Sequence, residues 1–383
     1  MAEENKKKKN KPKFFFDYTM FFIVIFLLLF GLVMLYSTSS YEANIKFGDS
    51  AYYFKKQALA SVLGFALMIV IMFVDYHLVQ QLAFIGYVVS LILIILVLTP
   101  LGYEAGGARR WLNLGVSLQP AEVAKLCLIV FFASIVCKMG DKINSKKGFI
   151  LVLALAFPHA FCVLTITQNL SSAIIIFCIV IMMLFVSTPQ YKEYFIIAGI
   201  GIAIAVAVVL LIKYDILPTS LSFRLARVKA WLDPESYAAD KGFQTLQALY
   251  AIGSGDYFGK GLGESIQKLG FLPEAQNDMI FSIICEELGL FGAFAIIILF
   301  IILTWRFMVI ANNAQDKFGA LLVVGVMVHI SIQVVLNIAV VTNTIPNTGI
   351  TLPFISYGGS SILFLLAEMG LVLSVSRSIR LEE

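Results

Sequence analysis

The amino-acid sequence predicts an all-α polytopic membrane protein with ten transmembrane helices and a large extracytoplasmic loop between helices 7 and 8. Two observations predict this fold. Of the 383 residues, 60% are hydrophobic and only 14% are charged, whereas a soluble domain carries about 25% charged residues. The apolar residues also gather in runs of about 20, the length that crosses a bilayer. Most of the surface is therefore expected to face lipid.

The first apolar run, Phe14 to Tyr36, follows a lysine-rich tail. It has about 23 residues and no small-residue cleavage site after it, so it is too long for a signal peptide and is expected to be an uncleaved span. Only Thr167 to Leu170 separates the fifth span from the sixth. The ten predicted spans are residues 15–38, 52–74, 79–99, 121–138, 149–166, 170–187, 194–217, 278–304, 319–342 and 356–376.

Lysine and arginine predict the orientation, because short cytoplasmic segments are enriched in both. With the N-terminus inside, 15 of the 28 basic residues fall on the cytoplasmic side. An even number of spans returns the C-terminus to the same side. We therefore expect a basic cytoplasmic tail over residues 1–13, a membrane domain over 14–376 and a second cytoplasmic tail over 377–383.

The segment 218–277, between the seventh and eighth spans, has about 60 residues, too many for a simple connector, and long segments of this kind are usually functional. Six glycines lie between residues 253 and 270. Glycine allows backbone conformations and close approaches that other residues do not. We expect this part to form a tightly turned loop that packs closely against something else.

Residues Ser222 to Leu232 of this segment have the periodicity of an amphipathic helix, which Asp233-Pro234 ends. Arg224, Arg227 and Trp231 lie on one face of that helix. Two interpretations stay open. The helix lies in the membrane interface, where its arginines meet lipid phosphates, or it is an ordinary surface helix.

The eighth span carries acidic residues, which are costly inside a bilayer and indicate function. Asp278, Ser282, Cys285, Glu286 and Gly289 recur at helical spacing and share one face. We expect this face to line a protein cavity rather than to meet lipid, with Asp278 at the outer mouth. The alternative for Asp278 is a helix N-cap.

Buried ion pairs are the main alternative for the other acids of the spans. Glu286 and Glu287 are expected to pair with Lys125 or an arginine, because an unpaired buried charge is costly. Glu122 lies three residues before Lys125 on the fourth span, so these two can also pair with each other. Alternatively, Lys125 supplies positive charge to an anionic ligand. Pro120 suits the first turn of this helix.

A short outer loop before the fourth span holds Arg109, Arg110 and Trp111. Arginine recognises phosphate oxygens through two parallel hydrogen bonds, so these residues can bind a phosphorylated ligand. An arginine–tryptophan group also anchors a protein among lipid headgroups. The residues alone do not favour either interpretation.

The last outer segment, Asn343 to Tyr357, contains Pro346 and Pro353 and runs into Gly358-Gly359. This composition predicts a re-entrant or broken-helix element. Irregular backbone at membrane depth persists only where protein or a water-filled cavity covers it. The alternative is a plain loop followed by helix packing through small residues.

Several classes of site are not indicated. The five cysteines lie in apolar runs without a CxxC pair, so neither a disulfide framework nor a thiolate metal site is expected. The three histidines are far apart in the sequence. No basic stripe is interleaved with exposed aromatic residues, so nucleic acid is not expected as a partner.

Three stretches resemble the SEDS family (shape, elongation, division and sporulation), which contains the FtsW and RodA peptidoglycan polymerases and SpoVE. They are Gly107–Gly115 with Gln119–Lys125, Leu272–Phe281 with Glu286–Gly289, and Thr348–Ser361. These motifs occur in the family's order and extend over nearly the whole chain. The resemblance implies the ten-span fold of that family.

Within the family, Arg224–Arg227, Trp231–Pro234 and Gly261–Lys268 are more similar to the division-type FtsW branch than to the RodA branch. Two departures matter. Gln276-Asn277 stands where the family often has His-Thr, which puts histidine-dependent details in doubt. Asn169 stands where a related motif has an aspartate, which excludes an acidic role there.

The resemblance implies a peptidoglycan glycosyltransferase that polymerises lipid II on the outer face of the bacterial cytoplasmic membrane and releases undecaprenyl pyrophosphate. This reaction needs a base that takes the proton of an acceptor sugar hydroxyl, and fixed positive charge for the leaving pyrophosphate. We expect Asp278 to be the base. Family members are thought to use a divalent cation, so Mg²⁺ or Mn²⁺ is expected, shared with a phosphate.

The remaining expectations concern substrate and partners. Residues expected to bind substrate are Arg109, Arg110, Glu122, Lys125, Arg224, Arg227 and Ser356. Residues expected to support the site are Trp111, Gln119, Pro273, Glu274, Ser282, Glu286, Glu287, Thr351, Pro353, Tyr357, Gly358 and Gly359. The expected partners are a class B penicillin-binding protein transpeptidase and other membrane proteins of the division complex.

Two functions from other classes are kept as alternatives. A lipid II flippase would also use polar stripes and broken helices, but it should show matching polar sites on the cytoplasmic side, and the sequence has few. A non-catalytic scaffold of the division complex would leave the acidic stripe of the eighth span without a purpose.

Overall fold

The computed structural model of the protein describes residues 15–105, 108–113, 115, 117–189, 191–214, 216, 223–240 and 242–380. The helices are α1 (Tyr18–Phe47), α2 (Tyr52–Phe73), α3 (Tyr76–Gln81), α4 (Ala83–Leu96), α5 (Pro120–Met139), η1 (Gly140–Asn144), α6 (Lys146–Thr165), α7 (Leu170–Ser187), α8 (Tyr191–Lys213), α9 (Phe223–Leu232), α10 (Phe243–Ser254), α11 (Ile280–Asn312), α12 (Lys317–Val341) and α13 (Gly359–Ser378). The strands are β1 (Gly102–Ala105), β2 (Ala108–Asn113) and β3 (Ser117–Leu118).

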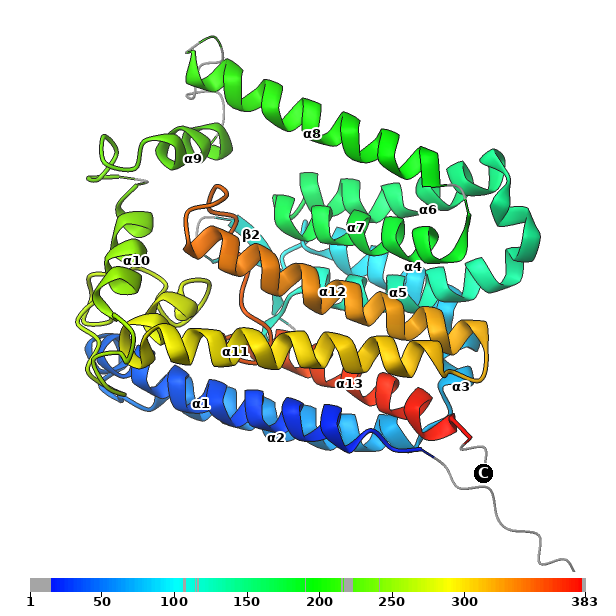
Figure 1. Cartoon of the computed structure of the whole chain (residues 1–383), viewed down its shortest axis with the longest axis horizontal. Helices are drawn as coiled ribbons and strands as arrows, with labels where there is room; N and C mark the ends of the chain where they lie inside the picture. Colours follow the sequence, from blue (N-terminus) through cyan, green and yellow to red (C-terminus); the bar gives the residue numbers. More distant parts are fainter. Residues whose placement is uncertain are drawn as a thin grey trace, which may run out of the picture.

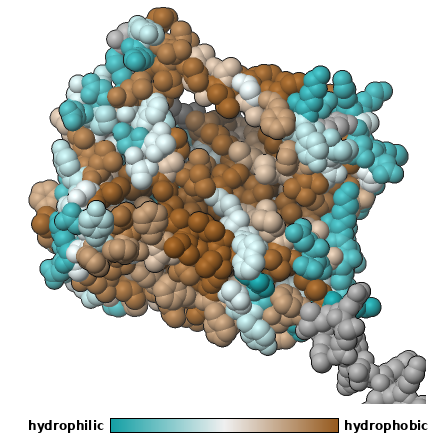
Figure 2. Space-filling model, in the orientation of Figure 1, coloured by the Kyte–Doolittle hydropathy of each residue, from teal (hydrophilic) through white to brown (hydrophobic). Residues whose placement is uncertain are grey.

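Within this part of the chain, nine helices are long and apolar enough to cross a membrane, and the shorter apolar helix α4 occupies the third predicted span. The fifth and sixth predicted spans are two separate helices, α6 and α7. Figure 2 shows apolar surface over the middle of the molecule and hydrophilic surface at its two ends. The all-α polytopic fold is therefore confirmed.

The helices form a bundle around α12 and α13 (Figure 1). The apolar window of α13 is 78% buried, and this helix packs chiefly against α2. The corresponding window of α8 is only 6% buried, and Figure 2 shows a hollow between α8 and the helices beneath it. The core thus lies among α2, α5, α12 and α13, while α8 stands at the edge.

Both ends of the described chain lie at one end of the bundle (Figure 1). The backbone N–H of Phe15 donates to the carbonyl of Ile379 (3.0 Å). Next to this contact, Asp17 caps α1 by accepting from the N–H of Met20 and pairs with Arg306 (2.8 Å). Ends on one side of the bundle require an even number of crossings, as ten spans do.

Two polar contacts between α1 and α11 bracket the apolar layer. Asp17 meets Arg306 at one level, and Ser37 donates to Glu287 (2.7 Å) at the other. Twenty residues separate these levels on α1 and nineteen on α11, which at 1.5 Å per residue is about 30 Å. This is the thickness of a bilayer's hydrocarbon core. Glu287 therefore lies at the boundary opposite the chain ends.

The helix α11 is broken at Gly289, whose φ of 67° and ψ of −168° are not helical. A loop from the 218–277 segment fills the break. Four backbone hydrogen bonds join the loop to the helix on both sides of the break: Lys260 to Glu286, Gly261 to Glu287, Leu290 to Asp256 and Phe291 to Tyr257. The predicted close approach of a glycine loop is confirmed, because a Cβ on Gly259 would lie 2.2 Å from the Glu287 carbonyl oxygen.

A small antiparallel sheet, β1-β2-β3, precedes α5. The sequence did not predict it, because its strands have two to six residues and no clear alternation. The strand β2 carries Arg109, Arg110 and Trp111, and Trp111 lies opposite Tyr103 of β1. The sheet fixes residues that were expected in a plain loop.

The segment between α12 and α13 is irregular and buried, as predicted for a re-entrant element. Leu352, Phe354 and Ile355 are each at most 2% exposed. Phe354 has a φ of 64°, and its carbonyl oxygen would lie 2.5 Å from a Cβ on Gly31 of α1. Gly31 therefore lets this segment pass between helices.

Candidate active site

Asp278 lies just before α11, at the end of the bundle opposite the chain termini. Met279 holds the N-cap position and no side chain caps the helix, so the N-cap interpretation of Asp278 is wrong. The side chain is buried, at 7% exposure. Among the described residues, its carboxylate has no ion-pair partner. A buried, unpaired acid is a strong candidate for chemistry.

The environment of Asp278 favours the protonated form. Burial raises the pKa of Asp278 from 3.8 to about 7, and the negative charge of Glu274 adds to the rise. The charge of Arg227 opposes it. A base with a pKa near the working pH combines ionisation with proton affinity, which suits general base catalysis.

Asn337 of α12 fixes the backbone that carries Asp278. Its Nδ2 donates to the carbonyl oxygens of Asp278 and Ile350, both at 2.7 Å. Ile350 belongs to the irregular segment before α13, where Gly349 lies close to the acid. A Cβ on Gly349 would lie 3.9 Å from Asp278 Oδ2, and the φ of Gly349 is +70°. The start of α11 and the irregular segment are thus held as one unit.

Gln244 of α10 joins the same two segments from the other side. Its Nε2 donates to the carbonyl of Pro273 (3.1 Å), and its Oε1 accepts from Asn347 Nδ2 (2.8 Å). The backbone of Tyr357 also donates to Gln276 (2.9 Å). Residues 273–278 and 343–358 together therefore form the walls beside the acid.

A cleft of about 220 Å³ opens between α9, α10 and these walls. Its flanks include Pro273 and Asn347, which border the segments around Asp278. The lining residues are Arg227, Trp231, Asp240, Phe243, Gln244, Thr245, Pro273 and Asn347. The cleft therefore borders the two segments that hold Asp278, and Asp278 itself is not among the described residues that line it.

The predicted helix of the 218–277 segment is confirmed as α9. Arg227 Nη1 donates to the carbonyl of Asn347 (3.2 Å), and Trp231 Nε1 donates to that of Asn343 (2.9 Å). The face with these two residues is thus anchored to the irregular segment before α13, and both side chains also line the cleft. The side chain of Arg224 lies outside the described residues.

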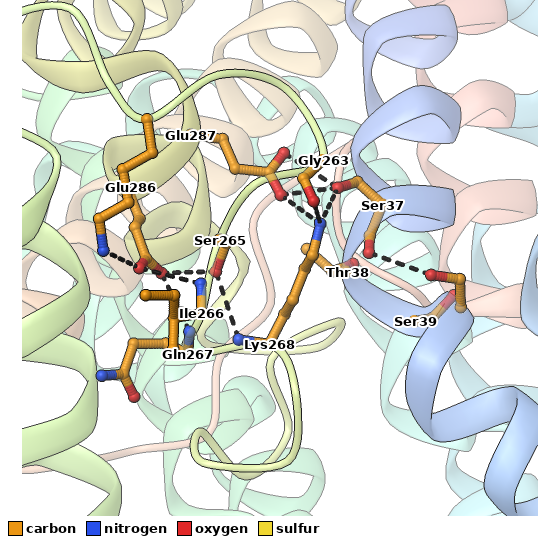
Figure 3. Close-up of polar contacts among 12 residues, drawn as sticks. Ser37, Thr38, Ser39, Gly263, Ser265, Ile266, Gln267, Lys268, Glu286 and Glu287 are labelled. Atoms are coloured by element: carbon orange, nitrogen blue, oxygen red, sulfur yellow. Dashed lines mark hydrogen bonds and ion pairs between the residues drawn. The ribbon is translucent and has the colours of Figure 1, made fainter.

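Glu286 and Glu287 are paired, as expected, but the expected partners were wrong (Figure 3). Glu286 pairs with Lys260 (2.6 Å) and Glu287 with Lys268 (2.7 Å). Both lysines come from the loop that fills the break in α11, where the sequence suggested Lys125 or an arginine. Glu286 also accepts from Ser265, Ile266 and Gln267. The expected cavity face below Asp278 is therefore a packed loop contact.

Glu122 and Lys125 pair with each other at 2.8 Å, and Lys125 is 2% exposed. The ion-pair alternative is thus the one that the structure shows. Ser361 Oγ donates to Glu122 (3.1 Å). Gln119 takes the N-cap position without a side-chain bond, and Pro120 lies in the first turn as predicted. This pair ties α5 to α13 inside the bundle.

Arg109 and Arg110 both bind backbone carbonyls. Arg109 donates to Gly102 (3.0 Å) and to Thr99, which closes the hairpin. Arg110 donates to the 167–168 turn at 3.1 and 3.2 Å, which joins the sheet to the start of α7. There Asn169 accepts from the N–H of Ser172 and caps α7. Both arginines thus stabilise the local fold through hydrogen bonds to backbone carbonyls.

The residues before α13 that were expected to support the site hold the irregular segment together. The N–H of Leu352 donates to Ser356 Oγ (2.8 Å), and Gln333 donates to the carbonyl of Thr351 (3.1 Å). Tyr357 packs edge-on against Tyr53 of α2. Further members of this group are Pro353 within the turn, Gly358, whose N–H donates to Gln57, and Gly359, which begins α13. Ser282, the remaining residue expected to support the site, lies in α11, where its hydroxyl donates to the carbonyl of Met279.

Sequence reasoning missed Asn337 and Gln244. Asn337 had a usable signal, because an amide in the middle of an apolar span is costly unless it is bonded. Gln333 lies four residues before it and bonds the same irregular segment, so the two amides mark one face of α12. Gln244 had no signal beyond its place in the long outer segment.

The residues beside Asp278 could coordinate a divalent cation only together with ligands from the substrate. Among the described residues, no cluster of three or more His, Cys, Asp or Glu side chains could enclose a metal. Glu274 is exposed and accepts from Asn277 Nδ2, and the buried Asn277 Oδ1 has no hydrogen-bond partner among the described residues. Two such oxygens suit Mg²⁺ or Mn²⁺ that takes its other ligands from phosphate and water.

The chain matches the family model of FtsW, RodA and SpoVE, described as cell cycle protein, over residues 18–381. It is 39% identical to stage V sporulation protein E of Bacillus subtilis (strain 168), over 92% of this chain and 94% of that protein. It is 40% identical to the probable peptidoglycan glycosyltransferase FtsW of Trichlorobacter lovleyi, over 93% and 91%.

Two solved structures are similar over nearly the whole chain. One belongs to a study of how a peptidoglycan synthase complex coordinates polymerization and crosslinking. It has a TM-score of 0.77 and 27% identity, and the match covers 95% of this chain and 98% of that chain. The other is the rod shape determining protein RodA of Thermus thermophilus, with a TM-score of 0.69, 26% identity and coverage of 96% and 98%.

Proposed function

Because the chain belongs to the FtsW, RodA and SpoVE family of cell cycle proteins, we infer that it is a peptidoglycan glycosyltransferase. It polymerises lipid II into glycan strands and releases undecaprenyl pyrophosphate. The observation that carries the proposal is Asp278, a buried acid with no ion-pair partner among the described residues, held by two segments that border a cleft. The names of the relatives support the reaction class.

Asp278 acts as the general base. It takes the proton of an acceptor sugar hydroxyl while that oxygen attacks the anomeric carbon of the donor. The bond between the anomeric carbon and the pyrophosphate oxygen breaks, and undecaprenyl pyrophosphate leaves. Asn337 supports this role, because its hydrogen bonds to the carbonyls of Asp278 and Ile350 fix the backbone that carries the acid.

Positive charge at the reacting centre comes from Arg227, whose charge acts on Asp278. Its anchoring to the Asn347 carbonyl pre-organises the guanidinium, so it need not reorient as negative charge develops. A divalent cation, when bound, would neutralise charge on the leaving pyrophosphate, and Glu274 with Asn277 would hold it.

The substrate enters from the membrane. The basic residues of the short segments favour both termini in the cytoplasm, which puts Asp278 on the outer face. The hollow beside α8 (Figure 2) is bordered by apolar side chains and can take the lipid tail. Lipid can therefore reach the bundle sideways while the sugar pyrophosphate stays at the wet outer end.

The protein works with a class B penicillin-binding protein transpeptidase in cell division. The similarity to a chain from a peptidoglycan synthase complex supports such a partner, and the match to FtsW of several bacteria supports the division branch. Depletion of this protein should therefore give filaments with unfinished septa. Round cells, or a defect seen only in spores, would exclude the division role.

The decisive experiment uses the purified protein in lipid, with lipid II and Mg²⁺ or Mn²⁺, with and without its transpeptidase. Glycan chains are separated on a gel. The wild type is expected to form them and Asp278→Asn is not. Transfer of lipid II between leaflets without polymer would support the flippase and reject the enzyme.

A further inference from the structure

We propose that the cleft beside Asp278 is a glycan subsite, which holds an N-acetylated sugar ring of the growing strand. The inference rests on the proposed function and names the part of the substrate that this cleft takes. The cleft lies between α9, α10 and residues 273 and 347, and its volume is about 220 Å³.

Two aromatic side chains make the cleft suited to a sugar ring. Trp231 and Phe243 both line it and both are half-buried. The Trp231 Nε1 is already bonded to the carbonyl of Asn343 (2.9 Å), which fixes the indole in one orientation. The face of an aromatic ring is electron-rich and attracts the polarised C–H groups of a pyranose. A fixed indole therefore offers a preformed stacking surface.

The polar lining supplies directional contacts that a sugar needs. Gln244 and Asn347 bond each other at 2.8 Å, so their amides are held in place rather than free to rotate. Side-chain amides present both donors and acceptors, which match the hydroxyl and acetamido groups of the sugar. Ligand pockets usually combine apolar side chains, such as Trp231 and Phe243 here, with a few fixed polar groups.

The charge of the described lining suits a neutral ring. Among the described residues, the lining carries one cation, Arg227, and one carboxylate, Asp240. A pyrophosphate is held by an excess of positive charge, whereas a neutral polar ring needs none. The described lining therefore fits the sugar better than the leaving group.

The position of the cleft fits the reaction. Pro273 and Asn347 line it and also belong to the two segments that hold Asp278. A sugar stacked on Trp231 would thus lie beside the two segments, 273–278 and 343–358, that position the base. This placement would aim one ring hydroxyl of the acceptor toward Asp278, which lowers the entropic cost of the attack.

The test uses a soluble probe, a β-1,4-linked trimer of N-acetylglucosamine, which has neither peptide nor phosphate nor lipid. Intrinsic tryptophan fluorescence of the full-length protein in lipid nanodiscs is followed during the titration. We expect a saturable change that Trp231→Phe abolishes. Phe243→Leu should weaken binding by about tenfold, the upper range for loss of an aromatic contact. Phe243→Tyr, which keeps the ring, should bind like the wild type.

The matched control is Phe258→Leu, since Phe258 is 82% exposed and lies outside the cleft. It should bind the trimer as the wild type does. Equal binding by Phe243→Leu and Phe258→Leu, or displacement of the trimer by inorganic pyrophosphate, would overturn the inference.

Polymerisation of lipid II is measured on the same preparations. Phe243→Leu should raise KM for lipid II about tenfold and change kcat little. An active wild type that ignores the trimer rejects the subsite alone. A wild type that binds the trimer in the expected manner but makes no glycan rejects the proposed function and leaves a glycan-binding cleft.

Discussion

The side-chain amide of Asn337 donates 2.7 Å hydrogen bonds to the carbonyl oxygens of Asp278 and Ile350. Asn337 is fully buried, and one nitrogen thereby joins the start of α11 to the irregular segment before α13. Neither carbonyl belongs to a regular helix or sheet. The orientation of the candidate base therefore depends on a residue of a third element, α12.

Asn337→Leu should lower kcat for glycan synthesis more than it raises KM, because it leaves two carbonyls without donors, at about 1–3 kcal/mol each. Gln333→Leu is the matched control, since the described hydrogen bonds of Gln333 go to Thr351 of the same segment and not to the backbone of Asp278. Steady-state kinetics and thermal unfolding of both variants measure the difference. Equal losses of kcat would mean that Asn337 acts only through general packing of the segment.

Asp278→Asn should abolish detectable polymerisation, with a loss of about 10²–10⁴-fold from the missing base. The same variant should insert like the wild type and, at pH 7 and above, be at least as stable, because a neutral amide of equal size replaces a buried carboxylate that has no ion-pair partner among the described residues. Gel analysis of glycan chains gives the activity, and circular dichroism gives the stability. Activity above a tenth of the wild type would remove Asp278 from its role.

The pH dependence follows from the raised pKa of Asp278, which is about 7 instead of 3.8. The base works when ionised, so kcat/KM should rise with pH up to about 7 and then level off. The stability of the folded protein changes in the opposite direction. The folded state binds the proton of Asp278 more tightly than the unfolded state does, so the free energy of unfolding falls as pH rises from 3.8 to about 7. Asp278→Asn should remove both effects, and a wild type whose kcat/KM is flat across pH 6–8 would contradict the assignment.

The sequence predicted the spans well because each depends only on local hydrophobicity, and α7 begins and ends at the predicted residues. It also predicted the buried irregular segment, since Pro346 and Pro353 act locally. It did not predict the partners of Glu286 and Glu287, because Lys260 and Lys268 reach them only when the loop enters the broken helix. That contact depends on tertiary packing, which a helical repeat does not contain.

Most of the candidate site was likewise outside the reach of periodicity. Asp278 was identified as an acid at a helix start, but its burial comes from α12 and from the segment around Gly349. Arg109 was interpreted through its charge, yet its guanidinium closes a hairpin that no pattern indicated. The sequence predicted the chemical character of each residue. It did not predict which polar side chains form hydrogen bonds within the fold and are therefore not free to bind a ligand.

Gly289→Ala should destabilise the protein and lower activity. The φ of +67° at this position is strained for alanine, and its Cβ would lie 2.3 Å from the backbone nitrogen of Gly259. Strain of this kind costs about 1–3 kcal/mol. Gly201→Ala on α8 is the control, because a Cβ there meets nothing within 4 Å. If both variants unfold at the same temperature, the loop is not held by the break in α11.

Lys268→Met should be among the most destabilising single changes in the outer segment. Lys268 and Glu287 are 7% and 0% exposed at their side chains and lie 2.7 Å apart, so removing the lysine leaves a buried carboxylate that, among the described residues, only Ser37 bonds. Breaking a buried pair on one side costs about 3–5 kcal/mol.

The double variant Lys268→Met with Glu287→Gln separates charge from packing. It removes the unpaired charge and keeps an acceptor for Ser37, so it should recover most of the loss measured by thermal unfolding. Lys46→Met provides the comparison, since the Lys46–Glu42 pair is exposed, and exposed pairs contribute about 0–1 kcal/mol. If the double variant is as unstable as Lys268→Met, the aliphatic stem of the lysine, rather than its charge, holds the loop against α1 and α11. Recovery would show that this ion pair sets the stability of the loop that closes the broken helix.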